Sequence, residues 1–191
     1  MSNNKRLKEL LVTYSDAFTR ACEESRKEAL EKLVPGVPAP VPQKGIIHGA
    51  AYKERFGEEC RKIRSEAIDI LNAEADRIDK EKAVAPSEEA VRSISLFKMR
   101  GDKSIKTEDV DRLLDTYGGN YQAFKTITSI AHEKGIRTGR VHPLEGKDEV
   151  IGNLIHTFSY EINPWSAERG HASAGFCSML GASIDEVFPE K

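Results

Sequence analysis

The chain has 191 residues, of which 39% are hydrophobic and 31% are charged, and its formal net charge is −2. This balance excludes a protein whose whole surface is built to bind nucleic acid or anionic membrane. No stretch reaches the roughly 18 apolar residues of a membrane span, and the first residues lack the apolar core of a signal peptide. Three scattered cysteines do not make a disulfide framework. We therefore expect a soluble, cytoplasmic protein in a reducing compartment, with one or two domains.

A proline-rich segment divides the N-terminal half of the chain. Residues 34–42 contain four of the eight prolines, and proline fixes φ and removes a backbone donor, so this segment is expected to be extended. No proline interrupts residues 3–34 or residues 45–85. The sequence therefore predicts two long helices joined by a Pro-rich connection at 34–45.

Both long segments carry apolar residues at alternating spacings of three and four, which is the pattern of one helix face. Each helix is expected to reach about 30 residues, or roughly 45 Å. The connection either closes them into an antiparallel hairpin or holds them apart, so that each pairs with another copy; a narrow stripe serves both arrangements. The stripe expected to mediate self-association consists of Leu7, Leu11, Tyr14, Phe18, Phe56, Ile63, Ile70 and Ile78.

Shorter elements follow from residue 86 onward. Ser87 and Asn120 are typical helix N-caps, and the capped segments predict helices near 87–100, 107–117, 121–134 and 147–162. The tail, 166–188, predicts one or two short helices broken near Gly181. Because sustained period-2 alternation is lacking, we predict an all-α fold: the two long helices, then a bundle of about four to six shorter ones. The expected domains are 1–85, the long helical pair, and 86–191, a compact helical domain.

No constellation of residues predicts catalysis or a metal site. The five histidines include no pair at i, i+4 and no His-Glu-x-x-His motif. His171 and Cys177 are close in sequence, but catalytic Cys and His usually come from distant segments and need a third, orienting group. Packing is the simpler interpretation for both. We expect no enzyme activity and no cofactor.

Two classes of function remain from these patterns. The leading prediction is a non-enzymatic structural or assembly protein that forms a homo-oligomer, or binds another protein, through its long amphipathic helices. Small helical proteins of phage and bacterial assembly systems offer an analogy of general character only. The alternative is a nucleic-acid-associated regulator with a helix-turn-helix-like segment at 107–134 in the basic region 92–147. Its candidate contacts are Lys98, Arg100, Lys103, Lys106, Arg137 and Arg140.

Overall fold

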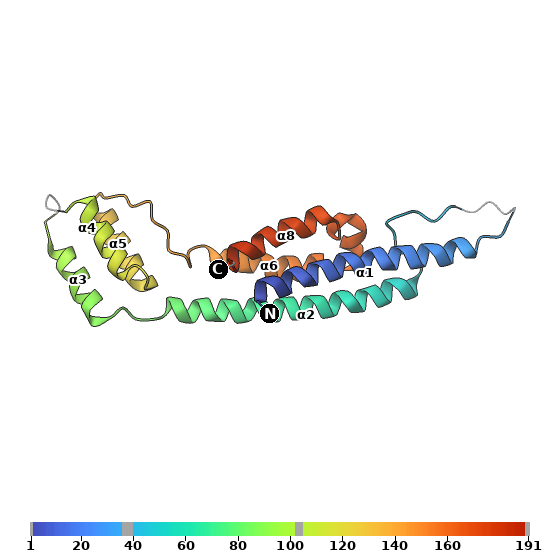
Figure 1. Cartoon of the computed structure of the whole chain (residues 1–191), viewed down its shortest axis with the longest axis horizontal. Coiled ribbons are helices and arrows are strands. Elements are labelled where there is room, and N and C mark those ends of the chain that lie inside the picture. Colours follow the sequence, from blue (N-terminus) through green and yellow to red (C-terminus); the bar gives the residue numbers. More distant parts are fainter. Residues whose placement is uncertain (1, 36–39, 102–104, 190–191) are drawn as a thin grey trace. The chain divides into compact units, whose positions relative to one another are not determined.

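A computed structural model describes residues 2–35, 40–101 and 105–189, and within these ranges the chain forms helices and no strand. The all-α prediction is therefore confirmed (Figure 1). The helices are α1 (Asn3–Glu31), α2 (Ala50–Lys82), α3 (Glu88–Met99), α4 (Thr107–Tyr117), α5 (Tyr121–Glu133), α6 (Lys147–Glu161), α7 (Pro164–Ser166), the π-helix η2 (Ala167–His171) and α8 (Ala174–Val187). Over the described ranges, no helix combines the length and the apolar character that crossing a membrane requires.

The two long helices form an antiparallel hairpin. Near the start of α1, the Arg6 guanidinium donates to the Glu66 carboxylate of α2, with 2.8 Å between Nη2 and Oε2. Further along, the Tyr14 ring stacks on Phe56, with 5.8 Å between centroids and 15° between planes. The pairing of early α1 residues with late α2 residues shows that the connection turns the chain back. Of the two arrangements left open by the sequence, the hairpin is thus the observed one.

The chain forms two compact units, Met1–Ala73 with Glu149–Lys191, and Glu74–Asp148. This division differs from the predicted domains 1–85 and 86–191, because the C-terminal helices pack against the N-terminal hairpin. The Ser15 hydroxyl of α1 donates to the Ala172 carbonyl at 2.8 Å. The Tyr14 hydroxyl donates to the Glu161 carbonyl at 3.4 Å. Helix α8 lies alongside α1 in the first unit (Figure 1).

The second unit is a small helical body around α3, α4 and α5. Its core joins side chains from all three helices, including Ile94, Leu114 and Ile127, of which Ile127 is fully buried. The predicted N-caps are present: the Ser87 side chain accepts from the backbone N–H of Ala90, and that of Asn120 accepts from the backbone N–H of Ala123. The local signals therefore place the helix starts correctly here.

The expected break near Gly181 is wrong, since α8 runs without interruption from Ala174 to Val187. Leu180, Ile184 and Val187 lie on one face of α8 and are buried, so burial of this face outweighs the poor helix propensity of glycine.

Candidate interaction surface

The predicted self-association stripe lies largely inside the chain. Its buried members, all less than 5% exposed, are Leu7, Leu11, Tyr14, Phe56, Ile63 and Ile78. Phe18 and Ile70 are half-buried. The hairpin and the helices packed on it therefore cover most of the apolar surface that the sequence assigns to a partner chain.

An open groove remains between α1 and α8, on the outside of the first unit. It has a volume of about 580 Å³. Val12 of α1, which lines it, is 58% exposed, and Met179 on the same stretch of α8 is also 58% exposed. The residues lining this α1–α8 groove are Lys8, Leu11, Val12, Ser15, Asp16, Ala174, Cys177, Ser178, Gly181, Ala182 and Asp185.

From Ala174 to Ala182, the outward face of α8 is uncharged and, apart from Met179, consists of small residues. Ala174, Ser178 and Ala182 recur at a spacing of four, which places them on one side of the helix, and all three are exposed. No charged residue occurs from residue 172 to residue 184, although 31% of the whole chain is charged. Our sequence interpretation missed this surface; the uncharged run on an exposed helix is the signal that identifies it.

The C-terminal end of α8 is fastened to the start of α1. The buried Asn4 amide donates to Asp185 Oδ1 at 2.8 Å and to the Phe188 carbonyl at 2.7 Å. The Lys8 ammonium lies 2.5 Å from the same Asp185 oxygen. The hydrogen bond from Asn4 and the bond and charge of Lys8 lower the pKa of Asp185 below its ordinary value.

We predict that in the Asp185→Asn variant the free energy of unfolding depends less steeply on pH in the acidic range. Because the folded-state pKa of Asp185 is depressed, its contribution is present above the unfolded-state pKa of about 3.9 and is lost as the pH falls through the folded-state value. Below about pH 4, the free energy of unfolding of the wild type should fall more steeply than that of the variant. Urea unfolding at several pH values measures both slopes.

The matched control for this prediction is Glu186→Gln, which removes one negative charge from the same helix turn. Asn4→Ala should reduce this pH dependence as Asp185→Asn does, because it removes the first donor to the carboxylate. An equal reduction in Glu186→Gln would show that the contacts with Asn4 and Lys8 are not the cause.

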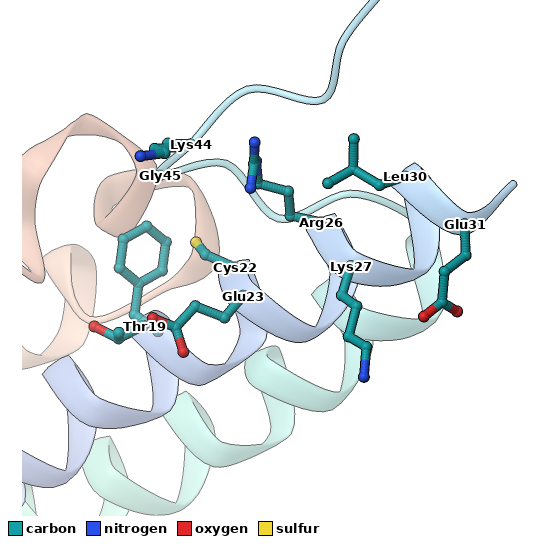
Figure 2. A pocket seen from close by; sticks show the side chains of 10 residues that line it. Thr19, Cys22, Glu23, Arg26, Lys27, Leu30, Glu31, Lys44 and Gly45 are labelled. Carbon is teal, nitrogen blue, oxygen red and sulfur yellow. The ribbon is translucent and has the colours of Figure 1, made fainter. Parts of the chain in front are cut away.

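A second cavity, of about 610 Å³, lies at the C-terminal end of α1, against the connection to α2. Figure 2 shows Arg26 extending toward the connection, where its Nε donates to the Pro42 carbonyl at 3.2 Å, whereas Lys27 extends to the other side. Phe18, Cys22 and Leu30 supply the apolar part of the lining. The charged residues around it carry both signs, so the lining does not select a ligand of one charge.

The three cysteines and His171 are partly or fully buried and contact other groups of the chain. Burial raises the pKa of the Cys22 thiol to about 11 and that of Cys60 to about 12, which disfavours the reactive thiolate. Burial likewise raises the pKa of Cys177, whose Sγ faces the Leu11 carbonyl at 3.8 Å. His171 Nδ1 lies 2.9 Å from a Glu161 carboxylate oxygen. These contacts support the packing interpretation of His171 and Cys177.

Two of the basic residues predicted to contact nucleic acid form ion pairs with acidic residues of α4. Arg140 Nη1 lies 2.5 Å from Asp115 Oδ1, and its Nε lies 3.3 Å from Asp111 Oδ1. Arg100 Nη1 lies 3.5 Å from Asp109 Oδ1. Because a phosphate would have to displace these carboxylates, the two arginines are poor candidates for backbone contacts.

Three more residues of that basic set are exposed on the surface. Lys98, Lys106 and Arg137 are exposed, and Lys103 lies outside the described residues. Helices α4 and α5 are joined by the short turn expected of a helix-turn-helix, but α4 presents acidic residues to the same surroundings. The nucleic-acid role remains a prediction, which a salt-dependent shift of duplex DNA would test.

Across the ranges that the structure describes, no group of three or more His, Cys, Asp or Glu side chains is placed to hold a metal ion. Comparison of the chain with models of protein families, with curated proteins and with solved structures finds no match.

Proposed function

We propose that this protein is a non-enzymatic assembly protein that self-associates through the outer side of α1 and the α8 helix beside it. The observation that carries the proposal is the α1–α8 groove, where Val12 is 58% exposed beside the uncharged residues of α8. Met179 of α8, next to the groove-lining Ser178, is also 58% exposed. Exposed apolar surface bounded by polar residues is typical of protein interaction sites.

The proposal keeps the predicted use of a long helix but moves the contact to another of its faces. The original stripe packs within the chain, whereas Val12 and Ser15 of α1 border the groove. A surface of this kind buries apolar area when a second protein covers it, which favours association by about 25 cal/mol for each Å² removed from water.

The oligomeric state of the purified chain tests the proposal. Light scattering after size-exclusion chromatography, over a range of protein concentrations, should show a species larger than the monomer that gains population as concentration rises. The double variant Val12→Lys, Met179→Lys should shift the equilibrium to monomer, because it places charge on both exposed apolar residues of the surface.

The matched control is Leu96→Lys, Met99→Lys. These α3 residues are 61% and 81% exposed, so the control replaces two apolar residues that are at least as exposed but lie outside the groove, and it should leave the association unchanged. A wild-type chain that stays monomeric at every concentration would overturn the proposal.

A further inference from the structure

The sequence of α8 is nearly symmetric about Ser178. Ser173-Ala174-Gly175 precedes it and Gly181-Ala182-Ser183 follows it, so the residues three, four and five positions before and after Ser178 are of the same type, whereas the two positions next to it on each side differ. In an antiparallel pair of identical helices related by a two-fold axis, residues equally far from the axis face one another. An axis at Ser178 would therefore bring Ala174 against Ala182 of the second copy.

The glycines of α8 are not explained by packing within the chain. A Cβ added at Gly175 or at Gly181 would meet nothing within 4 Å, and neither residue has a positive φ. Glycine is nevertheless a poorer helix residue than alanine. A helix from another chain packed closely against α8 would explain glycine at both positions, because small residues allow two helix axes to approach to about 8 Å.

The charges at the two ends of α8 favour an antiparallel arrangement. Glu186 is exposed at its C-terminal end, beside Asp185, whose carboxylate is already bound by Asn4 and Lys8. Arg169 is exposed just before the N-terminal end of α8, with its guanidinium over the Trp165 ring. Antiparallel helices would bring Glu186 of one copy to the N-terminal end of the other, where the helix dipole and Arg169 are both favourable to negative charge. A parallel pair would instead place the two Glu186 residues against each other.

We infer that α8 packs antiparallel against α8 of a second copy of this chain, with the two-fold axis at Ser178. This inference rests on the proposed self-association and specifies its geometry. Ala174, Ser178 and Ala182 form the line of contact, and Val12 of α1 borders it through the groove. The interface is isologous, so each copy contributes the same surface and the assembly closes as a dimer.

Cysteine crosslinking tests this geometry directly. In a Cys177→Ala parent, Ser178→Cys should give a disulfide-linked dimer on mild oxidation, because a residue on the axis faces itself within the roughly 4.4–6.8 Å between Cα atoms that a disulfide spans. Ala174→Cys and Ala182→Cys should each crosslink poorly alone. A mixture of the two should crosslink well, whereas a parallel dimer would give the reverse pattern.

A second experiment introduces a large side chain into the predicted interface and measures the dimerisation constant. Gly181→Leu should weaken dimerisation at least about tenfold, since it places a large side chain where the helices are closest. Gly152→Leu is the control: Gly152 is an exposed helical glycine of α6, also with nothing near an added Cβ. Its dimerisation constant should change less than about twofold.

The outcomes separate the inference from the proposal on which it rests. A wild-type monomer at all concentrations overturns both. A wild-type dimer that Ser178→Cys does not crosslink, or that Gly181→Leu leaves as tight as Gly152→Leu does, overturns only the α8 pairing and locates self-association elsewhere. Circular dichroism of each variant excludes loss of the fold as the cause of weaker association.

Discussion

Phe56→Ala should lower the free energy of unfolding by about 3–5 kcal/mol, the range for removing a buried aromatic side chain. Phe56 is 2% exposed and stacks on Tyr14, which is fully buried, while the Phe18 ring lies 5.7 Å away between centroids. Truncation removes contacts with both rings and leaves a cavity between the long helices. Urea unfolding followed by circular dichroism measures the loss.

The control is Tyr14→Phe, which retains the ring stack and removes only the hydroxyl. That hydroxyl donates to the Glu161 and Asn163 carbonyls at 3.4 Å each, which are long hydrogen bonds, so we expect a loss of about 1 kcal/mol or less. A loss for Phe56→Ala no larger than the control would show that the aromatic cluster does not hold the hairpin together.

Local sequence signals predicted most of the helices of this fold. The spacing of apolar residues in α1 and α2 and the Ser87 and Asn120 caps act within one or two turns, so they can be recognised without knowing the tertiary structure. Local signals do not identify the surface that covers the apolar stripe. A stripe specifies that something covers it, and α1 could be covered by α2, by α8 or by another chain with the same pattern.

The division into units escaped prediction because it depends on contacts between residues far apart in sequence. Asn4 donates to Asp185 across nearly the whole chain, and nothing local to either residue indicates that pairing. The α1–α8 groove was missed for the same reason. The uncharged run of α8 is visible in the sequence, but which side of α8 is exposed can be identified only once its opposite side is known to pack on α1.

The charge pattern shows a similar limit of sequence reasoning. The sequence predicts Arg140 as a nucleic-acid contact together with other basic residues, yet Arg140 lies against Asp111 and Asp115. Residues more than 20 positions apart in sequence neutralise one another here, so a basic stretch in the sequence is not a basic patch on the surface.

Ile127→Ala should destabilise the Glu74–Asp148 unit by about 2–5 kcal/mol, the range for this truncation in a core. Ile127 is fully buried in the cluster that joins α3, α4 and α5. Because compact units open as separate cooperative bodies, amide hydrogen exchange in the intact chain should accelerate in α3, α4 and α5. Exchange in α1 and α8 should keep its wild-type rate.

Ile151→Ala provides the reciprocal test, because Ile151 lies in the other unit and is 2% exposed. This variant should accelerate exchange in α1, α6 and α8 and spare α4 and α5, although the truncated side chain is the same. If either variant raised exchange equally in all these helices, the chain would unfold as one cooperative body. The two units would then be separate in their packing but not in their unfolding, because destabilising one unit would destabilise the other as well.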